Sequence, residues 1–297
     1  MSIILIIYKE TRAGHVGLDQ HEPTSRRGIA NRAKESKDHR FQNLYQGLNA
    51  EFLRECWQEL NKDAASGVDG VTAAQYQANL EENMEDLGRG LKTKRYRAKR
   101  VRRCYIPKDD GKERPLGIPA LEDKLVQLAG AKRLKAIYEQ DFLDFSTGYR
   151  PPRSAKETVA DRIFTRQYGC YGYIVEAEIK SFFDTIDPEG LRERLAQRID
   201  DHAFLHLIRK WLRAGILDTD GKSRDPETGT PPAGVIAPIL ANVYLHYALD
   251  LWFEKVVKKP ARGAAMLCRY ADDVVRHEAR YMQGARHLPP TVGWSNR

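Results

Sequence analysis

The stretch from 101 to 142 limits the fold most, because it joins two strands, a tight turn and a helix in direct succession. The run VRRCYIPK predicts a strand, DDGK a hairpin turn and ERPLGIP the returning strand. The next run, ALEDKLVQLAGAKRLKAIYEQDF, has apolar residues at helical spacing and predicts a long amphipathic helix. The chain is therefore expected to combine helices with antiparallel strands.

The part of the chain before this stretch is expected to be helical. Apolar residues three and four positions apart predict a helix from Phe41 to Leu60, and a second helix is expected over 73–91. The run ASGVDGVT, residues 65–72, separates the two helices with a pair of glycines. Residues 11–40 are polar and lack apolar periodicity, so 1–40 are expected to form a basic, poorly ordered N-terminal extension.

Composition narrows the classes of protein. The 297 residues are 41% hydrophobic, which is enough to bury a core in one large domain or two small ones. The formal charge of +8 fits a polyanionic partner, but also a merely basic soluble protein. The four cysteines form no CxxC pair, so neither a zinc knuckle nor a disulfide framework is indicated. This pattern fits a protein of a reducing compartment. The apolar start MSIILIIYKE is too short for a membrane helix and lacks the features of a signal peptide.

A dense group of cations lies between 92 and 103, with Tyr96 and Tyr105 among or beside them. Its candidate RNA-binding residues are Lys94, Arg95, Arg97, Lys99, Arg100, Arg102 and Arg103. Cations that neutralise phosphates, together with aromatic rings that stack on bases, are typical of contact with RNA or single strands. A solvated charged surface is the alternative, and composition alone leaves it open.

The run RYADDVV places the adjacent carboxylates of Asp272 and Asp273 just before two valines. Taken alone, such a pair is more often an ordinary turn than a metal site, because turns are rich in Asp.

Six runs follow one another over about residues 41–275: AASGVDGVT, RRCYIPKDDGKERPLGIPALEDKLVQLA, FSTGYRPPRSAKETV, VEAEIKSFFDTID, GTPPAGVIAPILANVYLHYALD and RYADDVV. In this order they resemble blocks of the group II intron-type reverse transcriptases. The order of six blocks is specific, whereas a single YADD would be weak. The resemblance implies an α+β fold, with the fingers and a partial palm of a right-hand polymerase over 41–275 and no thumb.

The resemblance also implies a reaction, RNA-directed DNA polymerisation by two Mg²⁺ ions, with an RNA template, a DNA primer and dNTPs as partners. Its metal site would comprise Glu178, Ile179, Asp272 and Asp273, of which the three acids would be catalytic. Its substrate-binding residues would be Lys108 and Arg114 over the triphosphate, Phe183 against the ribose, and Pro232 and Ala233 in the nucleotide pocket. The expected setting is intron splicing or mobility in a bacterial cytoplasm or an organellar matrix, with no membrane partner; the oligomeric state stays open.

Three departures from the family pattern indicate an impaired copy. Glu178 stands where the family has Asp, and Pro232 and Ala233 stand where it has Gln-Gly, which removes an amide, a backbone donor and a flexible glycine. The sequence after Val275 shows no period-two apolar pattern. We therefore expect no return strand, an unrelated tail over 276–297, and a truncated or frameshifted copy. The alternatives are a catalytically dead, maturase-like RNA-binding fragment and a chain that does not fold.

Overall fold

The computed structural model describes residues 25–107, 111, 113–150, 173–179, 182–224, 234–259, 265–278 and 294–295. The helices are α1 (Arg26–Glu35), α2 (Ala50–Glu59), α3 (Ala73–Ala78), α4 (Leu80–Lys92), α5 (Leu121–Tyr138), α7 (Phe182–Thr185), α8 (Pro188–Ala196), α9 (His202–Leu212), α10 (Ala237–Leu245) and the π-helical turns η1 (His246–Asp250) and η2 (Phe253–Val257). The strands are β1 (Val101–Pro107), β2 (Glu113–Ile118), β3 (Tyr173–Ile179), β4 (Ile216–Leu217), β5 (Ser223–Arg224), β6 (Ala265–Tyr270), β7 (Asp273–Glu278) and β8 (Trp294–Ser295). The predicted combination of helices and antiparallel strands is confirmed.

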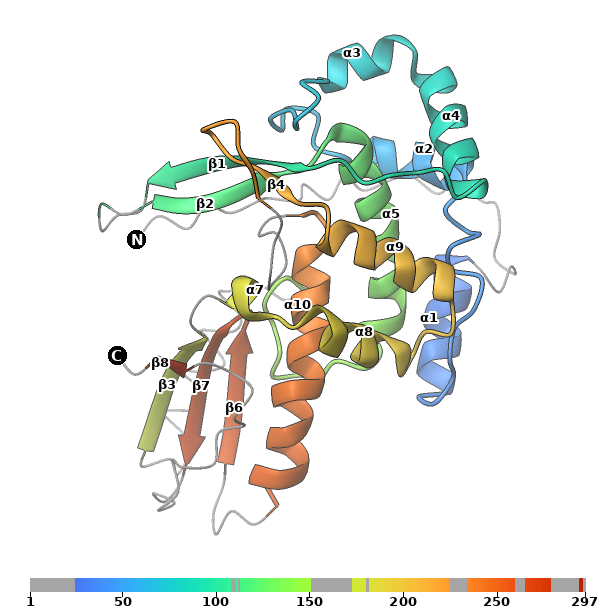
Figure 1. Ribbon diagram of the computed structural model, residues 1–297. Helices are drawn as coiled ribbons and strands as arrows, with labels where there is room; N and C mark the ends of the chain where they lie inside the picture. Colours follow the sequence, from blue (N-terminus) through green and yellow to red (C-terminus); the bar gives the residue numbers. More distant parts are fainter. Residues whose placement is uncertain are drawn as a thin grey trace.

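Helix α5 lies inside the helical part of the molecule, where it contacts α1, α2 and α10 (Figure 1). The predicted helix is confirmed, but its predicted amphipathicity is wrong. Helices cover α5 on several sides, so even Asp123, Lys124 and Lys132 are buried along it. These polar groups are paired; for example, Lys132 Nζ lies 2.6 Å from a carboxylate oxygen of Glu59.

Helix α1 gives the second half of the N-terminal segment a defined structure. The Ser25 hydroxyl caps its first turn by accepting the N–H of Gly28 at 3.0 Å. Ile29 and Ala33 are buried, and the helix packs against α5. The expected poor order of the extension is therefore wrong for Arg26–Glu35, while residues 1–24 lie outside the described part of the chain.

The two predicted helices before the first strand are shorter than expected. The first is helical only from Ala50, where the Asn49 side chain accepts the N–H of Phe52 at 2.9 Å. Phe41 instead exchanges backbone hydrogen bonds with Arg198 and Asp200, both at 2.8 Å. The second divides into α3 and α4 at Asn79, whose φ of −125° and ψ of 43° are not helical.

The first sheet has the strand order β2-β1-β4-β5 and extends from the helices as a long hairpin (Figure 1). The predicted hairpin is confirmed by antiparallel pairing from Arg102 opposite Ile118 to Pro107 opposite Glu113. Of the predicted turn, 109–112, the structure describes only Gly111, whose φ of 76° suits glycine. Strand β4 adds to β1 in parallel, and β5 returns beside β4.

The second sheet has the order β6-β7-β3-β8, with antiparallel neighbours, and lies beside the column formed by α10, η1 and η2 (Figure 1). Strand β7 pairs with β6 on one side and β3 on the other, through residue Glu278. The expected absence of a return strand is therefore wrong, and the strand passes the predicted end of the domain at Val275. Main-chain pairing on both sides overrides the missing apolar alternation.

Candidate active site

The acidic pair lies in the tight turn that joins β6 to β7. Tyr270 and Asp273 are opposed in the ladder, so Ala271 and Asp272 form the two-residue loop between them. Ala271 has a φ of 57°, a left-handed conformation that is uncommon for alanine. The turn thus places Asp272 at its tip and Asp273 at the first position of the next strand.

The end of β3 carries the third acid to the same place. Glu178 is directly opposite Asp273 in the antiparallel ladder, and the N–H of Ile179 donates to the carbonyl of Asp272 at 3.2 Å. Directly opposed residues point to the same face of a sheet, with Cβ atoms about 4.5–5.5 Å apart. The predicted meeting of Glu178 with the acidic turn is therefore present in the backbone register.

The carboxylates influence one another electrostatically. Burial raises the pKa of Asp272, the negative charges of Asp273 and Glu178 raise it further, and the Arg114 guanidinium opposes them. Arg114 belongs to β2, so the first sheet contributes a positive charge that acts on Asp272. Concentrated negative charge of this kind is relieved by a bound cation.

The donor chemistry of this site fits a hard divalent cation, because Mg²⁺ prefers carboxylate and carbonyl oxygens. Ile179 could add only its backbone carbonyl, since its side chain is a hydrocarbon. Over the described part of the chain, however, no group of three or more His, Cys, Asp or Glu side chains is gathered closely enough to hold a metal ion. The backbone therefore brings the acids together, but the side chains do not form a finished ligand set.

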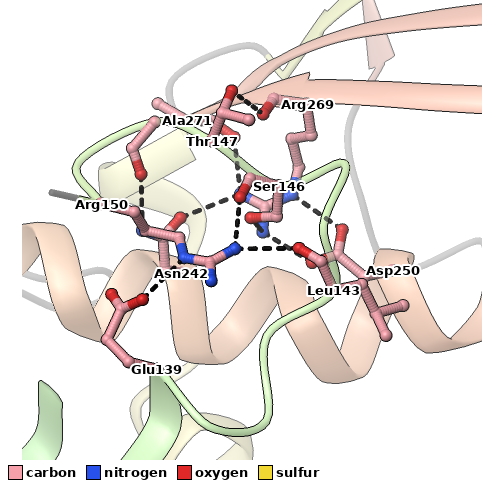
Figure 2. A network of polar contacts seen from close by, with 10 residues as sticks. Glu139, Leu143, Ser146, Thr147, Arg150, Asn242, Asp250, Arg269 and Ala271 are labelled. Atoms are coloured by element: carbon pink, nitrogen blue, oxygen red, sulfur yellow. Dashed lines mark hydrogen bonds and ion pairs between the residues drawn. The ribbon is translucent and has the colours of Figure 1, made fainter. Parts of the chain in front are cut away.

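A buried polar network lies directly behind the turn, and the sequence analysis did not anticipate it. Arg269, the last residue but one of β6, is fully buried and contacts Asp250, Asn242 and Ser146 (Figure 2). A signal was available, because Arg269 and Asp250 each interrupt an apolar run, and buried charges are normally paired.

The predicted substrate-binding residues are only partly described. Arg114 is exposed on β2, opposite Ile106, and its positive charge opposes the rise in the pKa of Asp272. Phe183 lies in the short helix α7, just after β3, while its neighbour Phe182 is buried against Tyr244. One of the two phenylalanines is thus a core residue, as expected. Lys108, Pro232 and Ala233 lie outside the described residues.

The predicted RNA-binding stretch runs from the end of α4 into β1. Lys94, Arg95, Arg97, Lys99 and Arg100 are exposed on the irregular segment between these elements, and Arg102 and Arg103 are half-buried on the strand. Some of these cations contact residues outside the stretch. Lys99 pairs with Asp69 at 2.9 Å, and Arg102 donates to the carbonyl of Ser66 at 2.7 Å.

The two tyrosines of this stretch differ. Tyr96 is buried, and its hydroxyl donates to Asp123 and accepts from the Trp211 indole at 3.0 Å, so its predicted availability for base stacking is wrong. Tyr105 is 39% exposed, and its hydroxyl lies 3.2 Å from Asp218. Only Tyr105 therefore presents a ring on the surface.

Comparisons with known proteins identify the family. The family model described as reverse transcriptase (RNA-dependent DNA polymerase) matches residues 106–294, which include all of β7 and therefore pass the predicted domain end at Val275. Protein YkfC of Escherichia coli K12 is 35% identical over 70% of this chain and 62% of its own length. The group II intron-encoded protein LtrA of Lactococcus lactis subsp. cremoris is 34% identical over 73% of this chain and 36% of its own length.

The chain thus spans less than two thirds of the length of both relatives. A chain of a partial Cas6-RT-Cas1–Cas2 complex aligns over 79% of this chain and 38% of its own, with 19% identity and a TM-score of 0.44. No helix within the described ranges is long and apolar enough to cross a membrane. The family match and the two relatives place the chain in the reverse transcriptase (RNA-dependent DNA polymerase) family, in its group II intron type.

Proposed function

We propose that this chain is an RNA-directed DNA polymerase, which adds deoxynucleotides to a primer end opposite an RNA template. The observation that carries the proposal is the register of the second sheet, in which the Asp272–Asp273 turn meets Glu178 at the end of β3. Two acids from a hairpin turn and one from a neighbouring strand end supply the oxygen donors of a two-metal nucleotidyl transfer site. On this proposal the second sheet with α10 is the palm, and the first sheet with the helices around it is the fingers.

The proposed metal ligands are the side chains of Glu178, Asp272 and Asp273 and the backbone of Ile179. When bound, Mg²⁺ ions would lower the pKa of the primer 3′-hydroxyl and neutralise charge on the triphosphate. The protein's own side chains would bind and orient the substrate. Arg114, whose charge already acts on Asp272, is suited to hold the triphosphate oxygens in a fork of parallel hydrogen bonds.

The other proposed substrate contacts are Lys108 on the triphosphate, Phe183 against the sugar, and Pro232 and Ala233 beside the incoming base. A bulky ring at Phe183 would exclude a ribose 2′-hydroxyl and so select deoxynucleotides. Pro232 and Ala233 contribute no side-chain hydrogen bond, so we expect their pocket to bind nucleotides weakly.

A second function is an RNA-binding, maturase-like protein without polymerase activity. Two observations favour it: Glu178 is one methylene longer than the family's Asp, and the acids do not form a gathered ligand set. A misplacement of about 1 Å can reduce a catalysed rate on the order of 100-fold. Under this alternative the exposed cations of the 94–103 segment retain RNA affinity while the catalytic step is lost.

Primer extension on an RNA template with Mg²⁺ distinguishes the two functions. If the chain is a polymerase, the wild type extends the primer, Asp272→Ala abolishes extension, and Glu178→Asp increases its rate by about 10- to 100-fold. Asp220→Ala, which removes an exposed carboxylate from a distant turn, is the matched control and should extend normally. If neither wild type nor Glu178→Asp extends the primer while both bind RNA in a salt-sensitive way, the polymerase proposal fails.

A further inference from the structure

The guanidinium of Arg269 uses all five of its N–H groups inside the protein (Figure 2). Nε and Nη2 form a fork on the two carboxylate oxygens of Asp250, at 2.8 and 2.6 Å. The second N–H of Nη2 donates to Ser146 Oγ at 2.6 Å. Nη1 donates to Asn242 Oδ1 and to the backbone carbonyl of Ala271, both at 3.0 Å. Arg269 and Asp250 are both fully buried, so these contacts are shielded from bulk solvent.

The contact with Ala271 links this network to the acidic turn. The carbonyl of Ala271 belongs to the peptide group that leads directly into Asp272. Ala271 holds the left-handed φ of 57°, which costs an alanine about 1–2 kcal/mol and persists only where the surroundings enforce it. A charge-assisted hydrogen bond to its carbonyl is such a constraint. Arg269 thus fixes the orientation of the peptide from which the Asp272 side chain projects.

The segment 145–148 holds the same turn from a second side. The N–H of Arg269 donates to the carbonyl of Phe145, and the carbonyl of Arg269 accepts the N–H of Thr147, both at 2.9 Å. These bonds attach the segment to β6 like a short extra strand. The Gly148 carbonyl in turn accepts from Asn242 Nδ2 at 2.8 Å. Asn242 therefore joins both the guanidinium and this segment to α10.

The π-helical turn η1 explains how Asn242 and Asp250 reach the same guanidinium. Residues eight positions apart on a regular α-helix are turned about 80° from each other. In η1 the N–H of Leu251 donates to the carbonyl of His246, five residues back, so the turn contains one extra residue. That residue restores nearly two full turns between Asn242 and Asp250, and both side chains then lie on the face toward Arg269.

Stability alone is a weak explanation for this arrangement. A buried ion pair often contributes little net stability, because desolvation offsets the attraction, and an apolar cluster of similar volume would serve as well. An apolar side chain would, however, leave the Ala271 carbonyl and the Asp250 carboxylate buried without a donor. A lysine has three donors for five acceptor contacts and no fork geometry. The arrangement is therefore suited to fixing one geometry of the turn.

We propose that Arg269 is a positioning residue, which orients the Ala271–Asp272 turn through its contact with the Ala271 carbonyl, while Asp250 and Asn242 anchor it to η1 and α10. This inference rests on the proposed function in one respect, that Asp272 is a metal ligand. It predicts that loosening Arg269 changes the turn first and the rest of the fold much less.

The test compares Arg269→Lys with Arg198→Lys in the full chain. Arg198 is the matched control, because it is also buried, pairs with Asp141 at 2.8 Å and donates to the carbonyls of Ser36 and His39, far along the chain from the turn. Amide hydrogen exchange on the metal-free protein measures opening of the 266–275 hairpin. Electron paramagnetic resonance titration with Mn²⁺ measures metal affinity without any need for catalysis.

We expect Arg269→Lys to accelerate exchange in the hairpin by about tenfold or more and leave exchange in α9 near the wild-type rate. Its Mn²⁺ affinity should fall by about 10-fold, as is typical when a residue that orients a metal ligand is changed. Arg198→Lys should lower the melting temperature yet leave hairpin exchange and Mn²⁺ affinity unchanged. If Arg269→Lys does not fold, Ser146→Ala takes its place. This change removes one acceptor and keeps the ion pair, so it should accelerate hairpin exchange and lower Mn²⁺ affinity by smaller factors.

Two results overturn the positioning role. One is hairpin exchange that is unchanged in Arg269→Lys, or equally accelerated in Arg198→Lys. The other is a loosened hairpin whose Mn²⁺ affinity equals that of the wild type, which would leave Arg269 as a purely structural residue. Failure of the proposed function looks different: the wild type itself then shows neither Mn²⁺ binding at the acidic turn nor primer extension. Hairpin exchange still decides whether Arg269 orients the turn in that case.

Discussion

Gly148 packs so closely against the turn that carries Asp272 that no side chain fits at this position. A Cβ atom built on it would lie 2.3 Å from the backbone nitrogen of Ala271 and 2.9 Å from the carbonyl carbon of Tyr270. Both are backbone atoms of the turn, which the Arg269 network holds in place, so neither can move aside easily. The absence of a side chain at Gly148 therefore lets the 145–148 segment lie against the turn.

We predict that Gly148→Ala destabilises the protein by about 1–3 kcal/mol, because the added methyl group overpacks a rigid contact. Chemical denaturation followed by circular dichroism measures the change. Gly90→Ala in α4 is the control: the nearest atom to its Cβ is 4.0 Å away, so the helix should gain about 0.5–1 kcal/mol. A Gly148→Ala protein as stable as the wild type would show that the turn can shift to accept the methyl group.

At the scale of elements, a buried cluster joins the segment after α4 to α5 and α9. The Tyr96 hydroxyl donates to Asp123 of α5, and the N–H of Lys99 donates to the other carboxylate oxygen of Asp123 at 2.9 Å. Trp211 of α9 donates its indole N–H to Tyr96, and Lys210 donates to the Tyr96 carbonyl at 3.1 Å. The cluster fixes the path of the chain from Tyr96 to Lys99 between α5 and α9.

This cluster predicts a pH dependence of stability. Burial raises the pKa of Asp123 from 3.8 to about 6, although the hydrogen bonds from Tyr96 and Lys99 oppose the rise. Because the folded state holds the proton more tightly than the unfolded state, the contribution of Asp123 is greatest below pH 4 and is lost as the pH rises to about 6. At about 1.4 kcal/mol per pKa unit, the loss amounts to roughly 2–3 kcal/mol.

The measurement is the free energy of unfolding of the wild type minus that of Asp123→Asn, from pH 3.5 to 7. Taking this difference removes the contributions of all other titrating groups. The difference should fall with rising pH in the window between about pH 4 and 6. The same change at the exposed Asp220 is the control and should follow the wild-type profile. A difference that is independent of pH would show that Asp123 does not titrate in this window.

The elements that sequence predicts well are those specified by local pattern. Strands β1 and β2 follow from their turn, and α5 follows from its helical spacing. Helix α1 is ordered because it packs against α5, and α4, which follows the break at Asn79, packs against α2. Strand β7 reaches Glu278 because it pairs with β6 and with β3, which lies far earlier in the chain. Local pattern does not contain these contacts, so the sequence predicts disorder, one helix and no strand instead.

The candidate site divides in the same way. The acids Glu178, Asp272 and Asp273 are predicted from the family resemblance of their motifs, and the sheet register brings them to one end of the second sheet. The ion pair between Arg269 and Asp250 is not predicted, because it joins a strand to a π-helical turn, and no local sequence pattern predicts such a turn.

At the scale of the whole molecule, the excess of positive charge is distributed unevenly. Several cations outside the 94–103 segment are balanced by carboxylates, as in the pairs of Arg54 with Glu81 and Arg192 with Glu189, each at 2.8 Å. The segment from 94 to 100 instead collects exposed cations on irregular backbone next to the first sheet. We therefore expect this segment to dominate attraction to a polyanion.

The prediction concerns binding of single-stranded RNA, measured by fluorescence anisotropy over a series of salt concentrations. The triple change Arg95→Gln, Arg97→Gln and Arg100→Gln should weaken binding at low salt. It should also reduce the slope of log affinity against log salt by about two, since three phosphate contacts at about 0.7 each are lost. The effect should be similar for RNAs of different sequence, because phosphate contacts carry no sequence information.

The matched control removes three exposed cations elsewhere, by Arg89→Gln, Arg192→Gln and Lys258→Gln. Both triple variants change the net charge from +8 to 8 − 3 = +5, so a difference between them reports position and not total charge. If the segment binds RNA, the control keeps the wild-type salt slope. If both variants lose affinity equally, the segment is a solvated charged surface, and the attraction belongs to the molecule's net charge alone.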